Sequence, residues 1–293
     1  TELFVDAAID FINERNSDQP FFAYVSLLAP HDPRIMPERF LKLYDPEAIA
    51  LPENFAKAHA IDTGALDIRD EVLAAQPRDP QEIKRHIAEY YAMITHLDEA
   101  LGRLLNALHE KGELENTIVV FAGDNGLAVG QHGLMGKQNL YDHSVRVPMI
   151  FAGPGIPQGE RRDALVYLLD IFPTLCDFAG LDTPLSVEGH SLQPCLDDPQ
   201  LKPRETLYLA YTHTIRGVTN GRHKLIEYAG GETQLFDLVS DPWEKKNLAQ
   251  SDSAAAVLCE LRSTLRQLAT EWGDENHPMG KNFWSKRPDL KNA

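Results

Sequence analysis

The sequence predicts an α/β fold in which a mixed, mostly parallel sheet is flanked by helices and is followed by a small antiparallel sheet. Apolar runs typical of strands occur at residues 21–28, 117–122 and 147–152. Segments with helical periodicity, at residues 2–15 and 80–111, lie before and between them. Because alternating strands and helices are typical of parallel sheets with helical crossovers, we expect a parallel arrangement in this part of the chain.

The longest predicted helix spans residues 80–111. Asp79 is suited to cap its N-terminus, and Gly112 is suited to end it. Its apolar residues recur with helical period, so we expect them to pack in the core. A further helix is predicted at residues 165–179, where the internal Pro173 should kink it or begin a new helical turn.

Beyond Gly189 the pattern changes to short strands separated by turn signals. We expect strands at residues 206–211, 214–219, 224–228 and 234–238. Asn220-Gly221, between the second and third of these, is the strongest hairpin signal in the chain. A helix at residues 254–272 is expected to cover the resulting antiparallel sheet.

These elements divide the chain into three expected parts. Residues 1–199 form the α/β domain, residues 200–272 form the subdomain with the antiparallel sheet, and residues 273–293 form an extended tail with basic residues among Pro, Asn and Gly. With 293 residues and 43% hydrophobic content, the chain can bury a sizeable core.

The composition excludes several classes of partner. The net charge of −16 argues against nucleic acid, which is bound through Lys and Arg contacts to phosphate. No apolar run approaches the ~18 residues that a membrane span needs, so none is expected. The three cysteines lack paired spacing, which argues against a disulfide framework or a zinc site. The sequence leaves the oligomeric state open.

The most informative segment follows the apolar run at residues 117–122. Asp124 and Asn125 place two hard oxygen ligands after a predicted buried strand, where open α/β sheets have their sites. His132 and Lys137 follow on the same Gly-rich loop. An isolated Asp-Asn-Gly is most often a turn, but a long polar loop between two apolar strands favours function. The group is suited to bind a tetrahedral oxyanion and to transfer a proton.

Three motifs occur along the chain in an order that a known enzyme family shares. They are Pro30-His31-Asp32-Pro33, the segment from Asp124-Asn125-Gly126 through His132 and Lys137 to Arg146-Val147-Pro148, and Leu235-Phe236-Asp237-Leu238 with Asp241-Pro242-Trp243-Glu244. Together they resemble the sulfatase family of the alkaline phosphatase superfamily. The resemblance covers nearly the whole chain.

One departure from the family pattern concerns the nucleophile. Sulfatases carry formylglycine made from Cys or Ser in a Cys/Ser-x-Pro/Ala-x-Arg motif, and no such motif occurs here. None of the three cysteines, Cys176, Cys195 and Cys259, fits it. The chain also begins at Thr1, inside a predicted helix. We therefore expect this chain to be the C-terminal portion of a sulfatase, with the formylglycine on an absent N-terminal segment.

The resemblance implies a role for each motif residue. Asp124 and Asn125 would be ligands of a divalent cation, usually Ca²⁺ in this family, with Mg²⁺ possible. A hard amide oxygen suits these ions, whereas zinc members of the superfamily usually have His at that position. Lys137 would contact the sulfate and the leaving oxygen, and His31 would deliver a proton to the departing alcohol.

Three further residues are candidates for substrate binding. His132 either lines the sulfate or sugar pocket or hydrogen-bonds its own loop, and the sequence leaves both readings open. His213 and Arg216 precede a strand that begins near the mouth of the active site in related enzymes, so they are candidate substrate contacts.

The reaction implied by the resemblance is hydrolysis of a sulfate ester, with a sulfated small molecule or carbohydrate as the substrate. Family habit also suggests a periplasmic or secreted protein, and any signal peptide would lie on the expected N-terminal segment. Two alternatives stay open. One is a phosphate or phosphonate ester hydrolase of the same superfamily, against which Asn125 argues. The other is a truncated, non-catalytic chain. A carbohydrate-binding module has little support, because the late strands show no aromatic platform.

Overall fold

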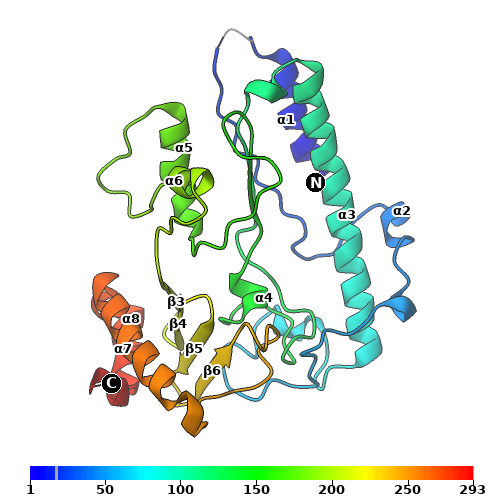
Figure 1. The fold of residues 1–293 in the computed structure, drawn as a ribbon. Coiled ribbons are helices and arrows are strands. Elements are labelled where there is room, and N and C mark those ends of the chain that lie inside the picture. Colours follow the sequence, from blue (N-terminus) through cyan, green and yellow to red (C-terminus); the bar gives the residue numbers. More distant parts are fainter. Residues whose placement is uncertain (17–18, 293) are drawn as a thin grey trace. The chain divides into compact units, whose positions relative to one another are not determined.

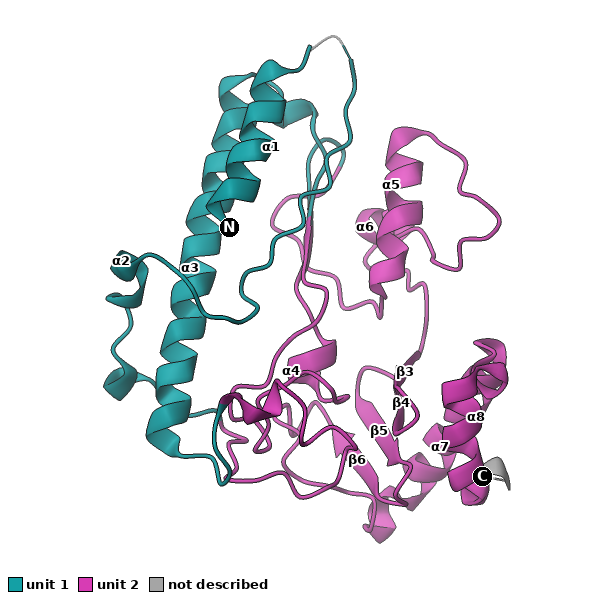
Figure 2. Ribbon diagram, turned by 180° about the vertical axis from the view of Figure 1, so that it is seen from behind, with its two compact units in different colours: residues 1–52, 74–120, 151–155 teal, residues 53–73, 121–150, 156–293 magenta. Residues whose placement is uncertain are grey.

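The computed structural model describes residues 1–16 and 19–292. They form two compact units, shown in Figure 2. The first comprises residues 1–52, 74–120 and 151–155, and the second comprises residues 53–73, 121–150 and 156–293. The domain boundaries expected after residues 199 and 272 stay a prediction.

The first unit is built on the long helix α3, Pro80–Glu110. Its N-cap is Asp79, as predicted, whose carboxylate accepts hydrogen bonds from the backbone N–H groups of Gln81 and Glu82 at 3.0 and 2.9 Å. These bonds satisfy two of the N–H groups that have no partner within the helix. The helix stops two residues before Gly112, which has a positive φ of 73°.

Helix α1, Glu2–Glu14, packs against α3 with Val5 and Ile12 buried. The ammonium of Lys111 donates to the carbonyl oxygens of Asn13 and Arg15, each at 2.9 Å. A cation at this end compensates the carbonyl groups that a helix C-terminus leaves unpaired. The α1–α3 pair thus has both an apolar and a polar contact.

The sheet expected in the first part of the chain differs from the observed one. Among the residues that the structure describes, strand β1, Val119–Ala122, pairs with β2, Met149–Ala152, and with no other strand, and both are shorter than predicted. Residues 21–28 belong to no strand, and Phe22 and Tyr24 are 74% and 83% exposed. An apolar run favours a strand, but a strand also needs a hydrogen-bonded neighbour. The described residues therefore do not form the mostly parallel sheet that the sequence predicts.

The second unit contains the predicted antiparallel sheet. Its order is β3-β4-β5-β6, with strands at Leu207–Tyr211, Ile215–Thr219, His223–Tyr228 and Thr233–Asp237. All neighbours are antiparallel. The hairpin signal is confirmed: Asn220 Oδ1 accepts from the N–H groups of Arg222 and His223 at 3.1 and 2.7 Å, and Gly221 has a φ of 84° that suits glycine.

Both faces of this sheet are buried. Alternate side chains of one face, including Val218, Leu225 and Leu235, pack against helix α7, Ala255–Glu271, which lies beside the sheet in Figure 1. Side chains of the opposite face form a second apolar cluster with residues of the predicted site loop. The members of that cluster are Ala128, Leu134, Leu140, Tyr141, Ile215, Ile226, Tyr228 and Phe236. The sheet therefore supports the site loop directly.

The remaining elements are short. Helix α5, Ile171–Ala179, follows a 3-10 turn at Leu168–Asp170, and Pro173 lies in its first helical turn, so the proline marks a new helix rather than a kink. Further helices are α2 (Glu38–Leu41), α4 (Asp142–Val145) and α6 (Gln193–Asp197), with 3-10 turns at Pro46–Ala48, Glu71–Leu73, Leu114–Asn116, Asp252–Ala254, Asp274–Asn276 and Pro288–Asn292. Within the described ranges, no helix is both long and apolar enough to cross a membrane.

The expectation of an extended tail after residue 272 is wrong. Helix α8, Pro278–Lys286, buries Phe283 and Trp284 in the core under the sheet, and Leu290 follows them there. The carboxylate of Asp274 anchors this segment by accepting hydrogen bonds from Tyr208 Oη and Trp284 Nε1 at 2.9 and 2.8 Å. The basic and Gly-containing composition concealed a small amphipathic helix. Ala293 lies outside the described residues.

We expect Phe283→Ala to lower the free energy of unfolding by about 3 to 5 kcal/mol, because the ring is fully buried and its loss leaves a cavity. Met279→Ala on the same helix is the matched control, since Met279 is 45% exposed and its loss should change stability by about 0.5 kcal/mol or less. Urea unfolding measures both. Equal midpoints for Phe283→Ala and the parent protein would contradict the packing of α8.

Candidate active site

The backbone at Asp124 and Asn125 is fixed by the glycine that follows them. The N–H group of Gly126 donates to the carbonyl oxygen of Ser144 at 2.9 Å. A Cβ atom on Gly126 would lie 1.9 Å from the carbonyl oxygen of His143, so no other residue fits. The Asp-Asn-Gly turn is therefore packed closely against residues 143–144. A turn that only reverses the chain direction does not need such close packing.

Asp124 and Asn125 themselves are exposed. The N–H group of Asn125 donates to Asp124 Oδ1 at 2.8 Å. A carboxylate and an amide oxygen on adjacent residues suit Ca²⁺ or Mg²⁺. Residues 1–16 and 19–292 contain no cluster of three or more His, Cys, Asp or Glu side chains that could hold a metal ion, at this pair or at any other place. The pair thus fits a divalent cation as part of a coordination shell.

Lys137 is a partly buried lysine, with 23% of its side chain exposed. Its Nζ lies 3.6 Å from Oδ2 of the buried Asp70. The backbone next to Lys137 is held by Glu71, whose carboxylate accepts from the N–H groups of Met135 and Gly136 at 3.0 and 2.9 Å. Neither acidic residue could be predicted from the sequence, because nothing in their local pattern indicates that they meet a loop more than 60 positions later.

His132 is a structural part of the loop. Its N–H group donates to the carbonyl oxygen of Asn54 at 2.8 Å, and its Nε2 lies 3.1 Å from the amide Nδ2 of Asn54. Its ring stacks on that of Tyr141, with 4.0 Å between the ring centroids. Its carbonyl oxygen accepts from His59 Nδ1 at 2.9 Å. Of the two readings left open by the sequence, this geometry favours the hydrogen-bonded loop residue, and a substrate contact stays a prediction.

Burial keeps the histidines around Tyr141 neutral. Desolvation, with the nearby His59 as the next cause, lowers the pKa of His132 to about 4. Desolvation also lowers the pKa of His59, and it lowers that of His143 well below its ordinary value. These rings therefore carry no charge near neutral pH, so His132 cannot hold an anion by charge.

Two polar networks attach the end of the loop to the sheet. The hydroxyl of Tyr141 donates to Gln234 Oε1 at 2.8 Å, and burial raises the pKa of Tyr141 to about 12. The N–H group of Asp142 donates to Glu244 Oε2 at 2.8 Å, and Glu244 in turn pairs with the buried Lys224 at 2.8 Å. Lys224 also bonds to Asp142. Glu244 belongs to the Asp-Pro-x-Glu motif, so the sequence did contain a signal for this anchor.

The two remaining substrate candidates of the second unit differ in their surroundings. His213 is half-buried in the turn between β3 and β4, where a substrate contact stays a prediction. Arg216 is 1% exposed and pairs with Asp274 at 2.8 Å from its Nε atom, over the ring of Phe283. A guanidinium so enclosed cannot reach a ligand without disrupting the core, so its placement argues against the expected substrate contact.

His31 lies in the first unit, whereas the other predicted site residues belong to the second. Its side chain is 41% exposed. Its Nδ1 lies 2.8 Å from the carbonyl oxygen of Asp32, which accepts a hydrogen bond when that nitrogen is protonated.

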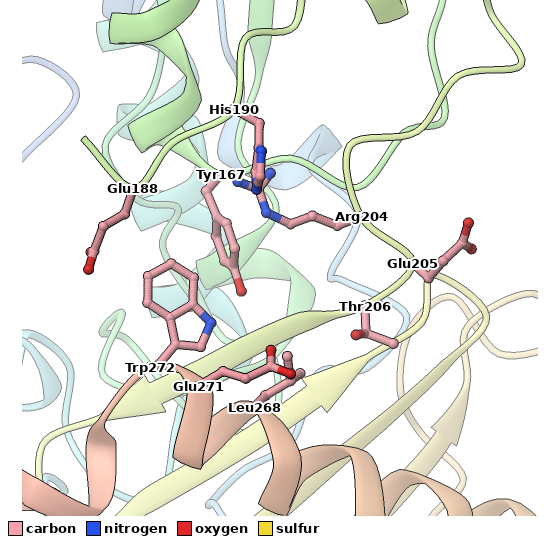
Figure 3. Close-up of a pocket in the computed structure, with 9 residues that line it drawn as sticks. All are labelled: Tyr167, Glu188, His190, Arg204, Glu205, Thr206, Leu268, Glu271 and Trp272. Atoms are coloured by element: carbon pink, nitrogen blue, oxygen red, sulfur yellow. The ribbon is translucent and has the colours of Figure 1, made fainter. Parts of the chain in front are cut away.

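A pocket of about 410 Å³ opens elsewhere in the second unit, and none of the predicted site residues lines it (Figure 3). Its one arginine, Arg204, is held by both oxygens of the buried Asp170 at 2.6 Å and packs over the ring of Tyr167. The other lining residues include Glu188, Glu205 and Glu271. An excess of carboxylates does not favour an anionic ester, so this pocket is not the candidate active site.

The low pKa of His132 predicts a dependence of stability on pH. Its folded value of about 4 lies below the ordinary 6.5, so the unfolded chain binds more protons and stability falls as the pH drops from ~6.5 to ~4. We expect His132→Asn to reduce the stability lost between pH 7 and pH 4.5 by on the order of 2 to 3 kcal/mol. Asn tolerates the left-handed φ of 51° at this position.

Urea unfolding at the two pH values measures this effect. The exposed His109, replaced in the same way, is the control. If His132→Asn loses as much stability between pH 7 and pH 4.5 as the parent protein does, the fold does not keep the imidazole neutral.

Comparison with known proteins relates these residues to a family. A family model described as Sulfatase matches residues 1–181, and one described as N-sulphoglucosamine sulphohydrolase, C-terminal, matches residues 130–271. An arylsulfatase of Clostridium perfringens is 33% identical over 277 residues, which cover 90% of this chain and 56% of that protein. The chain spans about half the length of the curated relatives that it matches.

Solved structures share the fold. One of them is described as a complex with its substrate D-glucosamine-2-N,6-O-disulfate. It has a TM-score of 0.79 at 24% identity, and the match covers 94% of this chain and 70% of that protein's chain. The phosphonate monoester hydrolase of Agrobacterium radiobacter has a TM-score of 0.79 at 25% identity, and the match covers 91% of this chain and 60% of that protein's chain. Because the Sulfatase model matches well over half of the residues, this chain belongs to the sulfatase family.

Proposed function

We propose that the protein that carries this chain hydrolyses sulfate esters, and that the loop from Asp124 to Lys137 is part of its active site. The observation that carries the proposal is the loop itself. It begins with two exposed oxygen ligands, contains a partly buried ammonium held on a fixed backbone, and lies within the residues matched by the Sulfatase model. Cation ligands and a lysine on one rigid loop suit an ester whose acid part is an anion.

The residues of this chain would act on the ester in three ways. Asp124 and Asn125 would hold a divalent cation, Ca²⁺ by family resemblance, which supplies Lewis-acid stabilisation of the sulfate oxygens. Lys137 would place its ammonium against the charge that grows on the leaving oxygen as the S–O bond breaks. His31 would give a proton to that oxygen. The nucleophile that the resemblance implies, formylglycine, would supply covalent chemistry from outside this chain.

A carbohydrate sulfate is the proposed substrate class. The match to the family model described as N-sulphoglucosamine sulphohydrolase supports it. The net charge of −16 means that a sulfated ligand must be attracted locally, by the cation and Lys137, rather than by the whole protein.

A phosphonate or phosphate ester hydrolase is the second candidate. The similarity to the phosphonate monoester hydrolase of Agrobacterium radiobacter favours it. Asn125 argues against it, because an amide oxygen at this position suits calcium or magnesium rather than zinc. Sulfate monoesters and phosphonate monoesters of the same alcohol distinguish the two.

In the full-length protein, we expect Lys137→Ala to lower kcat on sulfate esters by about 10²-fold or more without loss of the fold, because the ammonium stabilises charge in the transition state. Lys281→Ala, at an exposed position of α8, is the control for removing a lysine. Steady-state rates on matched sulfate and phosphonate esters provide the measurement. Near-normal rates for Lys137→Ala on every ester would remove this loop from the active site, and higher kcat/KM for phosphonates would favour the second candidate.

His31→Ala should also lower turnover, and its effect should depend on the leaving group. A phenol leaves without much protonation, whereas the alkoxide of a sugar needs a proton. We therefore expect a loss at least about tenfold larger for sugar sulfates than for aryl sulfates. Rates on both substrate types, for the parent and the variant, test this. Equal losses would leave His31 as a binding residue.

A further inference from the structure

We propose that Asp70 is a positioning residue for Lys137. Its carboxylate holds the lysine side chain directly and holds the lysine backbone through Gln138. The inference rests on the proposed function, because positioning matters only if Lys137 acts on the substrate. It concerns a residue that lies 67 positions earlier in the chain, in a segment without a recognisable motif.

The geometry is a closed ring of three residues. The backbone N–H group of Lys137 donates to Gln138 Oε1 at 2.9 Å. The amide Nε2 of Gln138 donates to Asp70 Oδ2 at 2.8 Å, and the same oxygen lies 3.6 Å from Lys137 Nζ. The ring thus joins the two ends of the lysine through one carboxylate.

The carboxylate at the centre of the ring is itself fixed. Asp70 is 5% exposed, and its other oxygen, Oδ1, accepts from Arg69 Nε at 2.9 Å. Burial would raise the pKa of Asp70, but hydrogen bonds from Gln138 and Arg69 and the charge of Lys137 together hold it below its ordinary value. Asp70 is therefore an anion at neutral pH. With both oxygens engaged and almost no exposure, it is not suited to act as a proton donor or base on a substrate.

The residues directly before Lys137 also lie in close contact with Glu71 and Gln138. Glu71 binds the N–H groups of Met135 and Gly136, directly before Lys137. A Cβ atom on Gly136 would lie 2.4 Å from Gln138 Oε1 and 2.9 Å from Glu71 Oε1. A side chain at this position would therefore displace the ends of the Gln138 and Glu71 side chains from their present contacts.

Such a ring matters because a lysine is flexible. Ordering its side chain costs conformational entropy, which must otherwise be supplied when the substrate binds. An ammonium displaced by about 1 Å can lose ~10²-fold in rate. Asp70 also neutralises part of the lysine charge, so its benefit must come from orientation rather than from electrostatic attraction of the sulfate.

A double-mutant cycle on the full-length protein tests this. We expect Asp70→Asn to lower kcat on a sulfate ester by about 10- to 100-fold with a smaller change in KM. In the Lys137→Ala background the same substitution should change kcat by about twofold or less, because its effect acts through the lysine. Asp67→Asn is the control: it is exposed, three residues away, and removes the same charge.

The outcomes separate the inference from the proposed function. Equal losses from Asp70→Asn in both backgrounds would overturn the positioning role and leave the sulfatase assignment intact. Normal turnover by Lys137→Ala alone would overturn both. Unfolding midpoints check that each variant folds. If Asp70→Asn does not fold, Gln138→Met breaks the ring with the carboxylate in place. It should lower kcat by about 3- to 10-fold only when Lys137 is present.

Discussion

The sheet β3–β6 must be covered on both faces, and this requirement determines how the second unit is built. Strand β4 is buried at every residue, so each face needs its own apolar partner. Helix α7 and the C-terminal helix α8 cover one face, with Leu261 and Phe283 in the core. The other face is covered mainly by the irregular loop that carries Lys137, with Val145 of the short helix α4 packed beside it. A loop that serves as a core layer cannot move freely, which gives a catalytic residue a rigid support.

Burying an irregular loop creates a second constraint, because its backbone polar groups lose water and have no helix or strand partners. Acidic side chains from distant segments meet this need. Glu71 binds two loop N–H groups, and Glu244 binds that of Asp142 while pairing with Lys224. Burial raises the pKa of Glu244, although Lys224 opposes the shift. These carboxylates connect the loop to two parts of the chain that lie on either side of it in sequence.

Local signals predicted the elements that depend on local physics. Asp79 caps α3 because an N-cap needs only its next two or three residues, and Asn220-Gly221 forms the β4–β5 hairpin because the turn chemistry lies within the turn. The position of Lys137 on a long loop after β1 could also be predicted, since glycines and polar residues between apolar runs indicate such a loop. The prediction of a strand at residues 21–28 was wrong, because an apolar run favours a strand but does not show whether a neighbouring strand is available to pair with it.

The partners of Lys137 could not be predicted for a different physical reason. An acidic residue in an irregular segment has the same local pattern whether it is solvated or buried beneath a loop, and Asp67 and Asp70 differ only in tertiary surroundings. Arg216 was misjudged in the same way: the resemblance suggested a position near the mouth of the active site, yet its guanidinium is enclosed with Asp274. Charge alone therefore does not identify a site. A lysine that is ordered by a buried carboxylate, yet keeps about a quarter of its side chain exposed, combines the orientation and the access that acting on an anion requires.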